Sequence, residues 1–199
     1  MIRETVGEIE IELETENGLF SPRAIDRGTR AMLGRAVIAP GMRVLDLGCG
    51  TGVVGIYCAH FTAPENVFMI DISPLAVETA RKNAARNGFP ISAFVSDGFR
   101  DFGETGFDLI LSNPPYQTDF AVARHFIEKG FNRLKVGGRM MMVTKRCAWY
   151  ENKLRSVFGG CRVEEADGYF VFTAEKRDAA YARAKQKCRQ GEKSAPSNK

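Results

Sequence analysis

The sequence predicts an α/β protein built on a seven-stranded, mostly parallel, doubly wound sheet that ends in an antiparallel hairpin. From Met42 onward, short apolar runs alternate with helical segments, which is the pattern of a parallel sheet covered by helices on both faces. Near the C-terminus two strand-like runs follow each other directly, joined by Asp167 and Gly168, a strong signal for a two-residue hairpin turn. The last strand should therefore run antiparallel to its neighbour.

Each element of this core is assigned from its own pattern. The first five strands are expected at residues 42–47, 66–71, 91–97, 107–112 and 137–145, and the last two form the hairpin within 161–175. Helices are expected at residues 51–61, 73–88, 119–134 and 149–158. The first five strands are expected to cross over through helices. Ser73 can cap the second of these helices and Gly88 can end it.

The segment before the core contains a different pattern. Residues 8–15 alternate acidic and mostly aliphatic side chains, which suits a strand with one solvated face at the edge of a sheet. A helix is expected over residues 19–37, with Ser21 as its cap and Pro22 at its first position. The chain thus divides into an N-terminal strand and helix (1–41), a core (42–175) and a C-terminal tail (176–199).

Composition excludes several classes of protein. The chain has 199 residues, 44% hydrophobic and 26% charged, which suits one domain with a real core. It contains no apolar run long enough to span a membrane and no signal peptide, so we expect a cytoplasmic protein. The five cysteines are scattered, without a C-x-x-C pair and without clustering with the two histidines, which favours reduced thiols and no metal. Nothing in the sequence specifies an oligomeric state.

Positive charge is concentrated in the tail. Residues 176–199 hold eight cationic and two acidic side chains, a charge of +6; because the whole chain carries +4, residues 1–175 carry −2. A basic extension on a mildly acidic domain suits an arm that seeks phosphate groups, and it equally suits a solvated tail.

A glycine loop follows the first core strand. Gly50, Gly52 and Gly55 satisfy G-x-G-x-x-G, and Asp71 lies about twenty residues further on, as in dinucleotide-binding proteins. However, Asp46 ends the strand just before the loop and places a carboxylate near where a pyrophosphate would bind. That carboxylate suits a cationic ligand instead, and S-adenosylmethionine carries an ammonium and a sulfonium but no phosphate.

The stretch VLDLGCGTG, residues 44–52, resembles the first motif of class I S-adenosylmethionine-dependent methyltransferases. The resemblance implies a Rossmann-like methyltransferase fold in which the loop backbone lies against the methionine part of the cofactor and Asp46 helps hold its amino group. Asp71 would accept both ribose hydroxyls, and Asp97 would reach the adenine amino group. The implied cofactor-binding residues here are Asp46, Gly48, Cys49, Gly50, Gly52, Asp71, Ile72, Asp97 and Gly98.

An Asn-Pro-Pro-Tyr turn, residues 113–116, stops the fourth core strand at the edge where ligands bind in open α/β sheets. The nitrogens of exocyclic amines and amides are poor nucleophiles because their lone pairs are delocalised. Two acceptors, the Asn113 side-chain oxygen and the Pro114 carbonyl, can orient such a nitrogen toward a methyl donor. Pro115 helps to fix the backbone, and Tyr116 offers a ring on which a planar substrate can stack. Asn113 is also a candidate cofactor-binding residue.

The segment GLFSPRAIDRGT narrows the resemblance. Its Gly18, Phe20, Ser21, Asp26, Gly28 and Thr29 match a stretch of the bacterial ribosomal RNA guanine-N2 methyltransferases of the small-domain group. In that family the stretch covers the cofactor pocket, so residues 1–41 should cover it here, with Phe20 and Ser21 as cofactor-binding candidates. The resemblance spans residues 18–175. The family carries a second, degenerate domain copy upstream, for which 199 residues leave no room, and this chain has a basic tail instead.

The resulting hypothesis is an N-methyltransferase acting on an exocyclic amino group of RNA, with guanine N2 of ribosomal RNA as the target. Lys145 and Arg146, beside Trp149 and Tyr150 on the same edge, are candidate RNA contacts, although they also suit an ordinary solvated helix start.

Three alternatives remain open. A protein glutamine N5-methyltransferase would usually add an N-terminal helical bundle, whereas residues 8–15 suit a strand. A non-catalytic RNA-binding module would usually have lost the glycine loop or the Asn-Pro-Pro turn. A dinucleotide oxidoreductase is disfavoured by Asp46 and does not explain residues 113–116.

Overall fold

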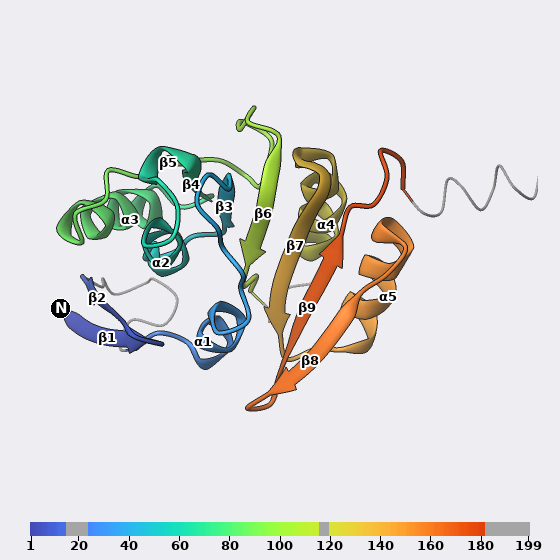
Figure 1. Ribbon diagram of the computed structural model, residues 1–199, viewed down its shortest axis with the longest axis horizontal. Helices are drawn as coiled ribbons and strands as arrows, with labels where there is room; N and C mark the ends of the chain where they lie inside the picture. Colours follow the sequence, from blue (N-terminus) through green and yellow to red (C-terminus); the bar gives the residue numbers. More distant parts are fainter. Residues whose placement is uncertain (15–23, 116–119, 182–199) are drawn as a thin grey trace, which may run out of the picture.

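The computed structural model describes residues 1–14, 24–115 and 120–181. Its main sheet has seven strands, as predicted, and their order is β5-β4-β3-β6-β7-β9-β8 (Figure 1). All neighbouring pairs are parallel except those of β9, which runs antiparallel to both β7 and β8. The strands are β3 (Val44–Leu47), β4 (Val67–Asp71), β5 (Ser92–Val95), β6 (Phe107–Ser112), β7 (Leu134–Thr144), β8 (Arg162–Ala166) and β9 (Tyr169–Glu175).

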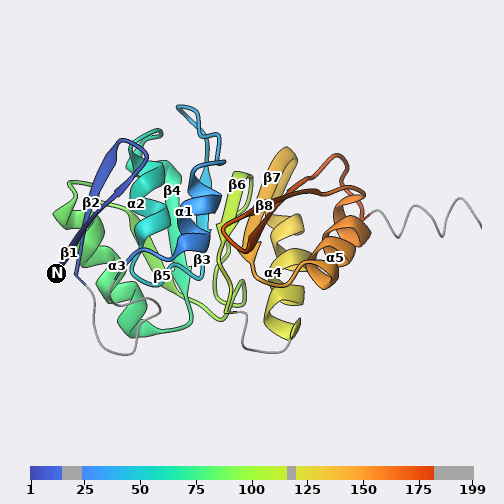
Figure 2. The same ribbon diagram turned by 90° about the horizontal axis from the view of Figure 1, so that it is seen from below.

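Helices cover both faces of this sheet. Along β3 the side chains alternate: Val44 packs with the core that includes α2 and α3, whereas Leu45 and Leu47 pack with the core that includes α4 and α5. On the second face, α4 and α5 lie side by side (Figure 2). The helices are α2 (Val53–Ala59), α3 (Pro74–Arg86), α4 (Phe120–Arg133) and α5 (Ala148–Phe158), with a short 3-10 turn, η1 (Pro64–Asn66).

The local signals for the hairpin and for α3 are confirmed. Asp167 and Gly168, between β8 and β9, have φ angles of 51° and 76°, the two positive values that a tight hairpin turn of this type requires. Ser73 accepts a hydrogen bond from the Ala76 N–H at the start of α3, and Gly88 follows its end with a φ of 83°.

Two expectations for the connections and helices are wrong. The crossover from β5 to β6, residues 96–106, contains no helix, and the buried rings of Phe99 and Phe102 fill the space instead. The N-terminal helix is shorter than residues 19–37: α1 spans Arg27–Leu33 and its cap is Asp26. The helix starts after Asp26 because the Asp26 carboxylate accepts a hydrogen bond from the Thr29 N–H, one of the free N–H groups of the first turn. Ser21 and Pro22 lie outside the described residues.

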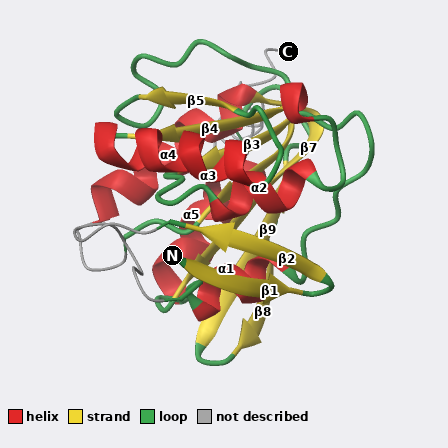
Figure 3. Ribbon diagram, turned by 90° about the vertical axis from the view of Figure 1, so that its left-hand side faces the viewer, coloured by secondary structure: helices red, strands yellow, loops and turns green. Residues whose placement is uncertain are grey.

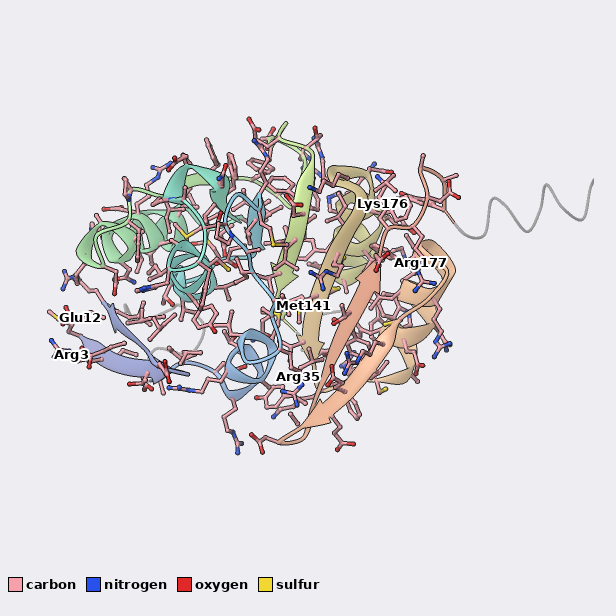
Figure 4. All side chains as sticks on the ribbon, in the orientation of Figure 1. Arg3, Glu12, Arg35, Met141, Lys176 and Arg177 are labelled. Carbon is pink, nitrogen blue, oxygen red and sulfur yellow. The ribbon has the colours of Figure 1, made fainter. Side chains whose placement is uncertain are left out.

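The N-terminal strand forms a separate sheet. β2 (Ile9–Leu13) pairs antiparallel with β1 (Ile2–Val6), a strand that the alternation at residues 8–15 did not reveal. Figure 3 shows this hairpin as a ribbon of its own outside the main sheet. Arg3 and Glu12 form an ion pair across it (Figure 4). None of the helices in the three described ranges is long and apolar enough to cross a membrane.

Two asparagines hold the hairpin on the main domain: Asn83 lies within α3 and Asn87 is its C-terminal cap. The Asn83 and Asn87 amides each accept and donate a backbone hydrogen bond, at Glu14 and Glu12 respectively, with distances of 2.7 to 3.0 Å. Asn83 and Asn87 are four residues apart, which in a helix is a rise of about 6 Å. Their partners Glu14 and Glu12 are two residues apart, which in an extended chain is about 6.6 Å, so the two spacings match. Asn83 also donates to the Thr51 carbonyl at 3.0 Å, which links the hairpin to the glycine loop.

Replacing Asn83 should therefore destabilise the whole protein. The side chain is fully buried, and Asn83→Ala would leave the backbone groups of Glu14 and the buried Thr51 carbonyl without this partner. We expect a loss of about 2 to 4 kcal/mol in the free energy of unfolding, measured by urea denaturation. The matched control is Lys82→Ala, one residue earlier and exposed, with an expected change of about 0.5 kcal/mol or less. Equal effects of the two changes would contradict the assigned role of Asn83.

Candidate active site

A cavity of about 350 Å³ lies where β3, β4, β5 and β6 end. Because neighbouring parallel strands run in one direction, the residues that follow these strands meet at one edge of the sheet. The predicted residues that line the cavity are Asp46, Gly48, Cys49, Gly50, Asp71, Ile72, Asp97, Gly98, Asn113, Pro114 and Pro115. The structure therefore brings together the glycine loop, the acidic strand ends and the Asn-Pro-Pro turn.

The glycine loop is held by the end of β4. Backbone N–H groups of Gly48 and Cys49 both donate to the Ile70 carbonyl, at 2.9 and 3.0 Å. Gly52 does not line the cavity; it caps α2 with a φ of 84°, and an added Cβ would lie 2.9 Å from the Cβ of Ala80. The contribution of Gly52 in this structure is thus the close packing of α2 against α3.

Asp46 is a buried carboxylate at the end of β3. Its Oδ2 accepts a hydrogen bond from the Gly55 N–H at 3.0 Å, and its exposure is only 2%. Burial raises the pKa of Asp46 from its ordinary 3.8 to about 7, the Gly55 hydrogen bond opposes this rise, and the charge of Asp71 adds to it. A cation at this end of the cavity would stabilise the ionised form.

Asp71 is fixed at the end of β4 by two backbone groups. Its Oδ2 accepts from the Gly50 N–H at 3.0 Å and its Oδ1 from the Ser73 N–H at 2.9 Å. Each carboxylate oxygen has a second lone pair for a ligand hydroxyl. Beside it, the Ile72 side chain is 65% exposed on the cavity rim, where it offers an apolar surface to a planar ring.

Asp97 and Gly98 follow β5 and line the cavity. Asp97 is half exposed and forms an ion pair with Arg100 at 3.2 Å. An added Cβ on Gly98, whose φ is 58°, would lie 2.7 Å from the His125 ring, so this turn requires glycine.

The Asn113 side-chain amide has hydrogen-bond partners for its NH₂ group but none for its oxygen among the described residues. Its Nδ2 donates to Asp26 Oδ2 and to Thr29 Oγ1, both at 3.0 Å. Its Oδ1 is buried and has no hydrogen-bond partner within the described part of the chain. The preceding Ser112 hydroxyl donates to the Leu47 carbonyl at 2.7 Å and so ties the turn to the end of β3. An orphaned acceptor in a cavity wall indicates a ligand that donates a hydrogen bond.

The charge of the cavity selects the kind of ligand. Its described lining includes the four acids Asp26, Asp46, Asp71 and Asp97, and within that lining there is no Lys, Arg or His. A pyrophosphate would meet only repulsion from these side chains, whereas a ligand with an ammonium and a sulfonium suits them. The residues present therefore fit S-adenosylmethionine and disfavour a dinucleotide.

The two cations predicted to contact RNA lie outside the cavity lining. Lys145 and Arg146 are exposed just after β7, whose end lies beside that of β6. The Lys145 ammonium lies 5.1 Å from the centre of the Tyr169 ring, and the Arg146 guanidinium lies 5.1 Å from the centre of the Phe120 ring. Trp149 stacks on Phe120 with 4.2 Å between ring centres. Phe20, Ser21 and Tyr116 lie outside the described residues.

The cysteines of the described ranges do not supply a reactive thiolate. Burial raises the pKa of Cys49 and Cys58 well above the ordinary thiol value, and it raises that of Cys161 to about 12. The Cys147 pKa is raised as well, again chiefly by burial. No cluster of three or more His, Cys, Asp or Glu side chains within these ranges could hold a metal ion.

Several residues of the site carried little or no signal. Phe126 and Val122 of α4 line the cavity and come from a segment that shows only helical periodicity. Asp26 and Thr29 belong to a matched motif, but their contact with Asn113 spans more than eighty positions of sequence. Such contacts depend on the fold alone.

The class of the protein follows from where the cavity lies and what lines it. An open α/β sheet with a glycine loop after its first core strand, acids at the ends of its first two core strands and an Asn-Pro-Pro turn after its fourth is the architecture of class I S-adenosylmethionine-dependent methyltransferases. The chain belongs to the methyltransferase small domain family, whose model matches residues 10–173. The resemblance and the cofactor expected from the glycine loop are thereby confirmed at the level of the family.

Individual relatives agree with this assignment. Ribosomal RNA small subunit methyltransferase C of Pseudomonas putida is 32% identical over 164 residues, which are 80% of this chain and 49% of the relative. The 16S rRNA N2 methyltransferase of T. thermophilus, solved with AdoMet and guanosine, superimposes with a TM-score of 0.81 at 27% identity, over 88% of this chain and 50% of the other. The chain spans about half the length of the curated relatives it matches.

The same fold also occurs in a solved structure whose name describes a different kind of substrate. A ribosomal protein L11 methylase of Lactobacillus delbrueckii has a TM-score of 0.64 at 22% identity, over 75% of this chain and 77% of the other. This likeness concerns the fold alone.

The buried Asp46 carboxylate predicts a pH dependence of stability. Because its folded-state pKa is raised to about 7 from 3.8, the unfolded chain loses this proton first, and stability falls as pH rises from about 4 to about 7. At about 1.4 kcal/mol per pKa unit, we expect a loss of roughly 3 to 5 kcal/mol over this range in the ligand-free protein. Asp46→Asn keeps an oxygen for the Gly55 N–H and should lack this component. The measurement compares urea unfolding of both proteins between pH 4 and pH 8. Two parallel curves would refute the raised pKa.

Proposed function

We propose that the protein transfers a methyl group from S-adenosylmethionine to an exocyclic amino group of RNA, with guanine N2 of ribosomal RNA as the target. The observation that carries this proposal is the unpartnered, buried Asn113 Oδ1 in the wall of an acidic cavity. That oxygen calls for an N–H donor, and the four acids leave the cavity suited to a cationic cofactor.

In this proposal the cofactor is held along the strand ends. Asp46 binds the ammonium group, the backbone of residues 48–50 contacts the methionine part, and the Asp71 carboxylate accepts the ribose hydroxyls. Ile72 packs on the adenine ring and Asp97 accepts from its amino group. Phe20 and Ser21 are proposed to cover the same pocket. When bound, the cofactor supplies an electrophilic methyl group. Residues of this chain bind the cofactor and orient the nucleophile.

The Asn-Pro-Pro turn acts on the nucleophile. Asn113 Oδ1 and the Pro114 carbonyl accept the two N–H groups of an aromatic amine, which orients the nitrogen and weakens the delocalisation of its lone pair. The two prolines hold these acceptors in place before substrate binds. Tyr116 is proposed to stack on the base, as aromatic side chains do for bases that enter a pocket.

Three features favour RNA over a protein glutamine. The relatives with about 30% identity are named as methyltransferases of ribosomal RNA. Lys145 and Arg146 place two cations beside the cavity edge, where they can contact phosphates. The strongly basic residues 176–199 add a further electrostatic attraction. We propose a cytoplasmic location, which suits such a substrate and reduced thiols.

Removing the Asn113 amide should abolish catalysis without preventing cofactor binding. We expect Asn113→Ala to lower methyl transfer to bulk RNA by a factor of about 100 or more, the usual effect of losing a preorganised polar contact. Its affinity for S-adenosylmethionine, measured by calorimetry, should stay within about threefold. The matched control is Asn132→Ala, which removes an exposed asparagine of α4.

The product identifies the target. Digestion of the methylated RNA should yield N2-methylguanosine, at a position that loses its methyl group in cells without the gene. Wild-type activity in Asn113→Ala would contradict the role of the turn, and methylation of protein but not RNA would favour the glutamine alternative.

The two cations of the cavity edge should set the salt dependence of RNA binding. If Lys145 and Arg146 each contact one phosphate of a single strand, their joint replacement by Ala should weaken binding and reduce the slope of log affinity against log salt by roughly 1.4. Lys135→Ala with Arg162→Ala is the control, because it removes the same charge from positions where β7 and β8 begin, away from the residues that follow β7. Equal slopes for the two double variants would exclude a specific role for Lys145 and Arg146.

A further inference from the structure

We propose that Asp26, supported by Thr29 and Tyr169, is a positioning group that sets which way the Asn113 amide faces, so that Oδ1 and not Nδ2 is presented to the substrate. The consequence for catalysis rests on the proposed function, whereas the orientation itself is a property of the protein without substrate.

The contacts come from three distant parts of the chain. Asn113 follows β6, Asp26 and Thr29 lie at the start of α1, and Tyr169 opens β9. Asn113 Nδ2 donates to Asp26 Oδ2 and to Thr29 Oγ1, both at 3.0 Å. The Tyr169 hydroxyl donates to the other carboxylate oxygen, Asp26 Oδ1, at 3.1 Å. The carboxylate thus lies between the tyrosine and the asparagine.

A carboxylate makes this orientation obligatory. An ionised carboxyl group only accepts hydrogen bonds, so the end of the amide that faces it must be the NH₂ group. Rotating the amide by half a turn would bring Asn113 Oδ1 against Asp26 Oδ2, two acceptors at hydrogen-bond distance. It would also present the NH₂ group to a substrate amine, donor against donor. Asp26 therefore selects the state in which the acceptor is available.

The carboxylate is itself held firmly. Asp26 Oδ2 accepts the Thr29 N–H at 3.2 Å as the cap of α1, and Thr29 and Tyr169 are both at most 5% exposed. Gly28 makes room for this arrangement, because an added Cβ would lie 2.6 Å from the Tyr169 ring and 2.8 Å from Asp26 Oδ2. One cluster thus accounts for Asp26, Gly28 and Thr29, the final members of the N-terminal motif.

The simpler account is that Asp26 only caps α1. Capping explains the hydrogen bond from the Thr29 N–H but requires neither Asn113 nor Tyr169. Serine is as good a cap as aspartate, so Asp26→Ser keeps an acceptor for the Thr29 N–H while it removes the carboxylate that faces Asn113 and Tyr169. This difference allows the two roles to be separated.

An exchange of the two side chains is the sharpest test. Asn113→Asp alone places two carboxylates in contact, and we expect RNA methylation to fall by a factor of about 100 or more. Adding Asp26→Asn allows the NH₂ group of residue 26 to donate to the carboxylate of residue 113, at the cost of the hydrogen bond from the Thr29 N–H, and leaves an oxygen of residue 113 for the substrate. We expect the double variant to recover at least tenfold in kcat over Asn113→Asp, with affinity for S-adenosylmethionine unchanged. A folded, cofactor-binding double variant without recovery would overturn the proposal.

A second measurement needs no RNA. In wild-type protein the side-chain amide protons of Asn113 should give NMR signals shifted downfield by the hydrogen bond to a carboxylate. Asp26→Asn should move these signals upfield, and Tyr169→Phe should move them less. The matched control is Asp101→Asn, which changes an exposed aspartate of the β5–β6 connection.

Unchanged Asn113 signals in Asp26→Asn would overturn the positioning role. Failure of the proposed function can be distinguished from failure of the positioning role. If wild-type protein methylates no RNA, the proposed function is wrong, and the amide signals still show whether Asp26 orients Asn113.

Discussion

Parallel pairing of β3 with β4 on one side and with β6 on the other is the interaction on which the rest of the site depends. It brings the ends of three strands to one edge, so that Asp46, Asp71 and Asn113 line one cavity although they are far apart in sequence. Hydrogen bonds between the strand ends then set the local geometry. The Ile70 carbonyl holds the glycine loop, and the Leu47 carbonyl holds Ser112, next to the Asn-Pro-Pro turn.

A cavity lined by acids is costly for the empty protein and favourable for a cationic ligand. Asp46 shows this most directly, because burial raises its pKa to about 7 even though Gly55 donates a hydrogen bond to it. Part of the stability available to the fold is thus given up to create a binding site. The same physical argument separates this glycine loop from those that bind dinucleotides, where a positive field must meet the phosphates.

The N-terminal elements complete the site from outside the main sheet. Asn83 and Asn87 bind the backbone of residues 12–14 and so fix the hairpin of β1 and β2 beside the glycine loop. The first turn of α1 contributes Asp26 and Thr29 to the Asn113 contact. This segment therefore reaches the turn that is proposed to act on the nucleophile.

The sequence by itself determined the seven-stranded sheet, the terminal hairpin and the residues at the strand ends. These depend on local signals: apolar runs, the Asp167-Gly168 turn, and motifs whose spacing is set by one strand and one loop. It did not reveal β1 or the connection without a helix between β5 and β6, because Ile2–Val6 is short and Phe99 and Phe102 pack only through the tertiary fold. Only the tertiary structure decided the start of α1 at Asp26 and the partnership of Asp26 with Asn113 and Tyr169. The physical reason is that a side-chain hydrogen bond between distant segments leaves no periodicity in the chain.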